Sequence, residues 1–250
     1  MTVRSTYSSG SDLETAVTVL RAALVRPPHR STNAAAQTFV TVSREAGAGG
    51  LSFSHRLAVR LNELPVRAPW MVWDHELAEK VSAEHGIAQT VVEMMEDRRQ
   101  TWLSDLMAGL SPSSQQPDEF KVYKRVATTI LAMARAGHAI IVGRGGRFIT
   151  QGFPWGIHIR LVAPLETRVR YMMEHYRISR NEAANRIREI DSARAAFYRR
   201  YWPGKSLAPD CFTITLNAGE MSVEEMVDCV LPLIRSREAG LAERAAAQPN

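Results

Sequence analysis

The residues best suited to chemistry lie in a glycine-rich turn between a short apolar run and a helix-like stretch. The apolar run covers residues 38–42, the turn covers residues 44–50, and apolar residues recur at helical spacing from Leu51. Glycines at positions 47, 49 and 50 remove Cβ atoms, so backbone N–H groups can turn toward an anion. The start of the following helix adds the positive end of its dipole. The turn is therefore either a phosphate cradle or an ordinary strand-to-helix connection.

This turn keeps part of the phosphate-loop pattern G-x-x-x-x-G-K-[ST]. If Gly49 is the second glycine, Gly50 stands at the lysine position and Arg44 at the first-glycine position. Arg44 could replace the missing lysine charge or point to solvent. Ser52 could ligate Mg²⁺ through its hydroxyl, or it could be a plain residue of the first helical turn.

A second set of reactive side chains lies on the helix predicted from Ser179 toward Tyr201. Arg188, Asp191 and Arg194 are spaced at i, i+3 and i+6, which keeps them on one broad face. The carboxylate could order both arginines, which would then neutralise a phosphoryl group. The other interpretation is an exposed helix whose charges form surface salt bridges.

Two further polar residues directly follow predicted strands. Asp74 comes after the run 70–73 and could contact an acceptor base or ribose, or cap the next helix. Arg144 lies in a second glycine turn, residues 143–146. An arginine between glycines at a strand end adds little to a fold, which favours a role in binding for Arg144.

The elements that must position these residues alternate along the chain. Apolar runs at 38–42, 70–73, 138–142, 157–162 and 212–216 predict strands. Helices are predicted at 51–63, 74–84, 90–110, 119–136, 164–176, from Ser179 toward Tyr201, and at 222–234. This alternation predicts an α/β fold with a five-stranded parallel sheet flanked by helices. Ligands of such sheets bind at the carboxyl ends of the strands, where the two glycine turns and Asp74 would meet.

The chain divides into three predicted parts. Residues 1–37 contain a helix over 12–25 and a proline-bearing linker, residues 38–237 form the main domain, and residues 238–250 form a frayed, flexible tail. The N-terminal helix would either dock on the main domain or pair two subunits as a homodimer.

Composition limits the class of protein. With 250 residues and 45% hydrophobic content the chain can bury one core, and no apolar run has the length of a membrane span. Cys211 and Cys229 are too few for a disulfide framework, which favours a cytoplasmic protein with no membrane partner. The net charge of +5 comes almost entirely from arginine, whose planar fork grips phosphate. Nucleic acid is not expected, because no basic stripe is interleaved with aromatic residues.

Four segments together resemble the cytidylate-kinase-like family of P-loop nucleoside monophosphate kinases. They are residues 43–50, residues 142–146, the stretch 162–164 with Arg168, and Asp191 with Arg194 and Tyr198. The resemblance spans roughly residues 38–235 in the order and spacing of the family. It implies a P-loop fold with a helical lid, here with an extra N-terminal helix.

The resemblance also implies an activity, the transfer of a phosphoryl group from ATP·Mg²⁺ to a small phosphorylated acceptor, CMP or dCMP. Gly47, Ala48, Gly49, Gly50, Leu51 and Ser52 would hold the ATP phosphates, with Ser52 on Mg²⁺. Asp74 and Arg144 would bind the acceptor, and Arg44, Arg188, Asp191 and Arg194 would serve catalysis.

The sequence departs from the family pattern at two positions. Leu51 stands where many members carry a basic residue, and Gly145 stands where cytidylate kinases carry an aspartate. Two alternatives therefore stay open: a degenerate P-loop module that senses nucleotide or binds a partner, and a kinase for another acceptor.

Overall fold

The structure is a computed structural model that describes residues 37–63, 68–74, 118–143 and 145–247. The predicted N-terminal helix, most of the segment predicted to form helices 74–84 and 90–110, and Arg144 lie outside the described residues. The pairing of subunits through the N-terminal helix stays a prediction.

Five parallel strands form the sheet, in the order β2-β3-β1-β4-β5. They are β1 (Phe39–Arg44), β2 (Met71–Trp73), β3 (Ala139–Val142), β4 (Gly156–Val162) and β5 (Ile214–Asn217). In the register Val42 lies beside Val142 of β3 and Ile159 of β4. Each predicted strand matches one of these five, and the predicted five-stranded parallel sheet is confirmed. Central strands of parallel sheets are buried on both faces, which is why they read as continuous apolar runs.

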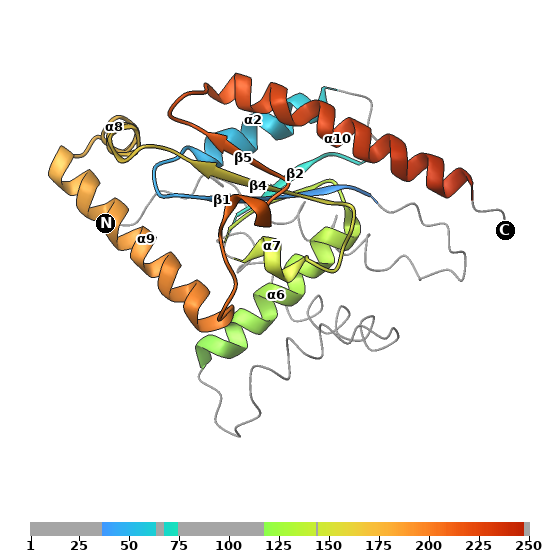
Figure 1. Ribbon diagram of the computed structural model, residues 1–250, viewed down its shortest axis with the longest axis horizontal. Coiled ribbons are helices and arrows are strands. Elements are labelled where there is room, and N and C mark those ends of the chain that lie inside the picture. Colours follow the sequence, from blue (N-terminus) through green and yellow to red (C-terminus); the bar gives the residue numbers. More distant parts are fainter. Residues whose placement is uncertain (1–36, 64–67, 75–117, 144, 248–250) are drawn as a thin grey trace.

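Helices cover both faces of the sheet (Figure 1). On one face lie α2 (Gly50–Asn62) and α10 (Val223–Ala246), and on the other lie α6 (Asp118–Ala136) and the short α7 (Gly146–Ile149). Alternate residues of β1 enter the two cores: Val40 and Val42 face α2 and α10, whereas Phe39 faces α6 and α7.

Salt bridges link the outer surfaces of α2 and α10. Arg60 lies 3.1 Å from Asp228 and 3.4 Å from Glu224.

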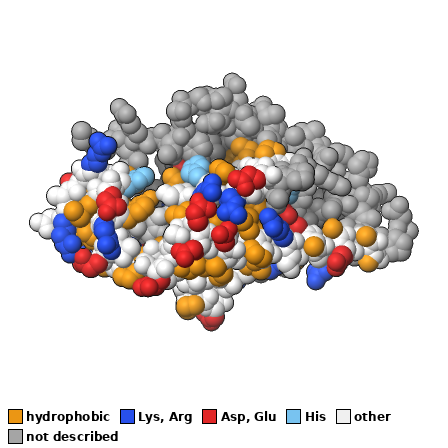
Figure 2. Space-filling view, turned by 90° about the horizontal axis from the view of Figure 1, so that it is seen from above, with side chains coloured by type: hydrophobic (Ala, Val, Ile, Leu, Met, Phe, Trp, Pro, Cys, Tyr) orange, Lys and Arg blue, Asp and Glu red, His pale blue; other side chains and the backbone are white. Residues whose placement is uncertain are grey.

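On the face in Figure 2, charges of both signs are interspersed rather than gathered into one basic surface. None of the helices in the described part is long and apolar enough to cross a membrane.

Two consecutive helices, α8 (Leu165–Tyr176) and α9 (Arg180–Tyr201), extend along one side of the sheet (Figure 1). Ser179 caps α9 as predicted, accepting a hydrogen bond from the Glu182 amide at 3.3 Å. The far end of α9 packs on α6, where the Tyr201 and Tyr123 rings stack with centroids 4.1 Å apart. Helix α9 therefore begins beside α8 and ends against the hydrophobic core that contains α6.

The C-terminal helix differs from the sequence prediction. We expected it to end at residue 234, with frayed residues from Glu238, but α10 continues to Ala246. The residues after Ile234 are mostly Ala, Arg, Glu and Leu, all of which favour helix. The helix therefore continues even though these residues form no apolar face toward the core. The prediction also missed α7 and the 3-10 turn η1 (Pro209–Cys211), both too short for a periodic signal.

A buried histidine lies inside the sheet. His158 of β4 is 8% exposed, and its Nδ1 lies 2.8 Å from the Thr41 hydroxyl. Burial, together with smaller effects of the positive charges of Arg147 and Arg237, lowers the pKa of His158 to about 3. The folded protein thus holds this imidazole neutral.

We predict that His158 makes the protein less stable in mild acid. Between the ordinary histidine pKa of 6.5 and the folded value of about 3, the unfolded chain binds a proton that the folded chain does not. From pH 8 to pH 5 this linkage lowers the free energy of unfolding by roughly 2 kcal/mol. Urea unfolding of wild type and His158→Gln, which keeps a polar neighbour for Thr41, should show a smaller decline in the variant. Equal declines in both proteins would contradict the prediction.

Candidate functional site

The glycine turn connects the end of β1 to the first residue of α2. Gly47 and Gly49 have φ angles of 79° and 69°, a left-handed conformation that favours glycine. A Cβ atom at Gly47 would lie 2.7 Å from the carbonyl oxygen of Arg168 in α8. Gly47 thus allows the backbone of α8 to approach the turn closely.

Several backbone donors of this turn are unpaired. The Ala48 amide donates to the Glu45 carbonyl at 3.2 Å, and the Ala46 amide donates to the Asp191 carboxylate at 2.9 Å. Among the described residues, the amides of Gly47 and of residues 49–52 have no acceptor. The last four belong to the N-cap and first turn of α2, where unsatisfied donors and the helix dipole attract anions.

Arg168 ties α8 to the turn. Its guanidinium donates to the Ala46 carbonyl at 3.2 Å and to the Ala163 carbonyl at 3.0 Å. It also forms an ion pair with Asp191 at 2.6 Å and lies 3.6 Å from Glu45. The Arg168 side chain is 12% exposed and the Asp191 side chain 33% exposed, so solvent weakens this network only in part.

Asp191 also orients a second arginine. Arg194 lies 3.6 Å from the Asp191 carboxylate and donates to the Arg44 carbonyl at 3.0 Å. The spacing of Asp191 and Arg194 predicted their common helix face, and the structure places both beside the turn.

Arg44 lies over the position of the missing lysine. A Cβ atom at Gly50 would lie 2.8 Å from Cγ and 3.0 Å from Cδ of Arg44. The aliphatic part of Arg44 therefore occupies space into which a side chain at position 50 would extend.

Ser52 makes a contact that the sequence analysis did not predict. Its hydroxyl lies 3.0 Å from the hydroxyl of Tyr171, which α8 presents to the turn. The hydroxyl predicted to ligate Mg²⁺ thus has a protein partner. Among the described residues, no group of three or more His, Cys, Asp or Glu could hold a metal ion.

Of the remaining predicted site residues, the structure describes Arg188 and Asp74. Arg188 is exposed and makes no hydrogen bond or ion pair with the described residues. Asp74 is half-buried directly after β2, and β3 lies between β2 and β1, the strand that leads into the glycine turn. Arg144 lies outside the described residues. The structure therefore groups Arg44, residues 47–52, Asp191 and Arg194, whereas Arg188 makes no hydrogen bond or ion pair with them.

Three residues of the site had no assigned role in the sequence analysis: Glu45, Arg168 and Tyr171. Glu45 accepts a hydrogen bond from the Ala163 amide at 3.1 Å and so joins the ends of β1 and β4. Arg168 follows the end of β4, a position that could have marked it as a site residue. Tyr171 had no such signal, because its contact with Ser52 joins residues 119 positions apart.

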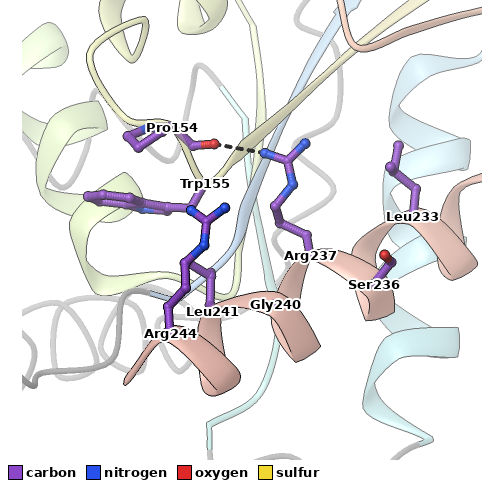
Figure 3. A pocket seen from close by; sticks show the side chains of 8 residues that line it. All are labelled: Pro154, Trp155, Leu233, Ser236, Arg237, Gly240, Leu241 and Arg244. Atoms are coloured by element: carbon purple, nitrogen blue, oxygen red, sulfur yellow. Dashed lines mark hydrogen bonds between the residues drawn. The ribbon is translucent and has the colours of Figure 1, made fainter. Parts of the chain in front are cut away.

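A separate hollow lies near the amino end of β4, between the residues that precede this strand and the C-terminal half of α10 (Figure 3). It has a volume of about 370 Å³, and Arg237 and Arg244 extend into it beside Trp155. Arg237 donates to the Pro154 carbonyl at 2.8 Å. Because it borders the amino end of β4, this hollow is distinct from the glycine turn at the carboxyl end of β1.

The parallel sheet, its strand order and the glycine turn with unpaired amides after β1 define an α/β protein with a P-loop type of fold. The sequence model of the cytidylate kinase-like family matches residues 39–220. The chain belongs to this family, as the resemblance indicated. Among curated proteins, none matches its sequence significantly.

Solved structures share its general architecture. An uncharacterized protein from Eubacterium ventriosum matches with a TM-score of 0.63 and 20% sequence identity, over 80% of this chain and 99% of that one. Shikimate kinase from Bacteroides thetaiotaomicron matches with a TM-score of 0.41 and 15% identity, over 79% of this chain and 98% of that one. The first similarity supports the fold, and the second is too weak to add to it.

We predict that the close approach of α8 makes Gly47 intolerant of a side chain. Gly47→Ala should lower the free energy of unfolding by about 2–4 kcal/mol, because left-handed strain adds to a clash with the Arg168 backbone. Gly204→Ala is the matched control, since Gly204 has a φ of 75° but nothing within 4 Å of its Cβ position. Urea unfolding should give only about 1 kcal/mol for the control. Equal losses in both variants would show that crowding at Gly47 is unimportant.

Proposed function

We propose that this protein transfers the γ-phosphoryl group of ATP·Mg²⁺ to a nucleoside monophosphate, with CMP and dCMP as the first candidates. The observation that carries the proposal is the row of unpaired amides at the start of α2, beside arginines that Asp191 holds in place. Family membership supports a nucleotide substrate.

The residues of this chain would act by positioning and charge. The amides of residues 49–52 would bind the β-phosphate, and the Ser52 hydroxyl would hold Mg²⁺, which neutralises phosphate charge when it is bound. Arg194, oriented by Asp191, would stabilise negative charge on the transferred group. An acceptor phosphate is already an oxyanion at neutral pH, so this reaction needs no general base.

The second glycine turn bears on the choice of acceptor. Gly145 has a φ of 77°, and a Cβ atom there would lie 3.1 Å from Nε1 of Trp202. The aspartate of cytidylate kinases would therefore be strained and crowded at this position. This supports recognition of the acceptor base by residues other than residue 145. It also supports phosphorylated acceptors other than CMP and dCMP.

A second candidate is a module that binds nucleotide without transferring phosphate. Two contacts favour it: Asp191 occupies the Ala46 amide, and Tyr171 occupies the Ser52 hydroxyl. The absence of a lysine at Gly50 points the same way, because loss of one electrostatic contact costs about 10²–10³ in rate.

Ligand stabilisation and product formation separate these candidates. We expect ATP with Mg²⁺ to raise the unfolding temperature by several degrees, and one or more of CMP, dCMP, UMP, AMP and GMP to do the same. In a coupled assay the same acceptor should give slow, Mg²⁺-dependent ADP release. Stabilisation without ADP release would support the binding module, and neither response would refute both functions.

We predict that Arg44 supplies part of the missing lysine charge. Arg44→Ala should reduce kcat by about 10²-fold or more, because the phosphates lose a nearby cation. Gly50→Lys alone should not raise kcat, since its side chain meets the Arg44 stem. The double variant Arg44→Ala/Gly50→Lys should recover much of the lost rate, because the lysine then has room.

The control for this series is Arg235→Ala, which removes an exposed arginine of α10. Its kcat should match that of wild type. An Arg44→Ala enzyme that keeps full kcat, or a double variant no better than Arg44→Ala, would show that Arg44 does not serve as the replacement cation.

A further inference from the structure

One face of α8 is directed at the glycine turn, and two of its side chains reach different parts of it. Arg168 and Tyr171 are three positions apart, so they lie on the same side of the helix. Arg168 contacts the Ala46 carbonyl, and Tyr171 contacts the hydroxyl of Ser52. The neighbouring buried residues Val169 and Met172 pack with Ala46, which fixes the rotation of α8 toward the turn.

The Tyr171 ring lies over the first turn of α2. Its Cε2 atom is 3.9 Å from the Cβ position of Gly49, and its ring stacks on His175 with centroids 5.4 Å apart. The ring is half-buried, and the hydroxyl is 3.0 Å from Ser52 Oγ. The hydroxyl therefore lies beside the unpaired amides at the start of the helix.

The two hydroxyls together leave a donor available. Tyr171 and Ser52 each carry one O–H hydrogen, and their mutual hydrogen bond uses one of the two. The other hydrogen can be donated to an oxygen bound at the amides of residues 49–52. A phosphate oxygen is the ligand group that matches a set of N–H and O–H donors at a helix start.

We propose that Tyr171 is a phosphate-binding residue, whose hydroxyl donates a hydrogen bond to the phosphate of a nucleotide held in the turn. Tyr171 thus provides an uncharged hydrogen-bond donor, from α8, to a turn that has no lysine. The inference rests on the proposed function in taking a nucleoside di- or triphosphate as the ligand. It assigns a role to a side chain that neither the glycine pattern nor the helix of Asp191 includes.

Calorimetric titration of the full chain with ADP and Mg²⁺ tests this assignment. Tyr171→Phe keeps the ring and its stacking on His175, so it removes only the hydroxyl. Loss of one hydrogen bond to a charged group should weaken ADP binding by about 10- to 100-fold. Tyr176→Phe is the matched control at the end of the same helix, where the tyrosine is 40% exposed, and should leave the Kd unchanged.

A double-variant cycle with Ser52→Ala separates direct contact from an effect transmitted through Ser52. If Tyr171 binds phosphate itself, Tyr171→Phe weakens ADP binding in the Ser52→Ala background as well. A loss that disappears in that background would overturn the proposal, because Tyr171 would then only orient Ser52. Unchanged or tighter binding by Tyr171→Phe would also overturn it.

In parallel, the formation of ADP from ATP by wild type is measured with CMP, dCMP, UMP, AMP and GMP as acceptors. Wild type that binds ADP but transfers no phosphate would refute the proposed kinase activity and leave the role of Tyr171 to be decided by the Kd values. Wild type that binds no ADP would refute both.

Discussion

The ion pair between Arg168 and Asp191 is the interaction on which the arrangement of the site depends. It joins α8 to α9, and each partner also bonds the turn: Arg168 through the Ala46 carbonyl and Asp191 through the Ala46 amide. Both backbone polar groups of Ala46, its N–H and its C=O, are thus hydrogen-bonded to this ion pair. Removing either charge would leave the other partly buried beside the turn, which is more damaging than the loss of an exposed pair.

The parallel sheet explains why so many polar groups gather at one edge. The carboxyl ends of β1 and β4 are adjacent, and Glu45 bonds the Ala163 amide across them. Helix starts follow these strand ends, so unpaired amides and arginines lie together there. Unpaired amides and arginine side chains are groups that bind phosphate, and the carboxylates of Glu45 and Asp191 lie among them. Both carboxylates are committed to the network, so they orient donors as well as reduce the charge.

The sequence was informative where a signal is local. Buried parallel strands appear as apolar runs, and the turn at Gly47 and Gly49 appears as glycine, so the sheet and the turn could be predicted. Asp191 and Arg194 could be paired from helical spacing, but their place at the turn depended on family resemblance. Tyr171 could not be found this way, since its role depends on the approach of α8 to α2. The end of α10 was missed because residues after Ile234 follow helix propensity without a periodic apolar face.

Helix α9 has contacts at two glycine turns. At Asp191 it bonds the turn after β1, and about two helical turns further on the Tyr198 hydroxyl accepts a hydrogen bond from the Gly145 amide at 3.4 Å, at the turn after β3. A helix is stiff over that length, so a displacement of α9 at Asp191 also displaces Tyr198. A ligand that competes with Asp191 for the Ala46 amide would shift the same rod that supports Gly145. If ligands bind at both turns and one of them displaces Asp191, their binding is thermodynamically linked through α9, and the linkage is reciprocal: whatever free energy one ligand contributes to the affinity of the second, the second contributes to the first.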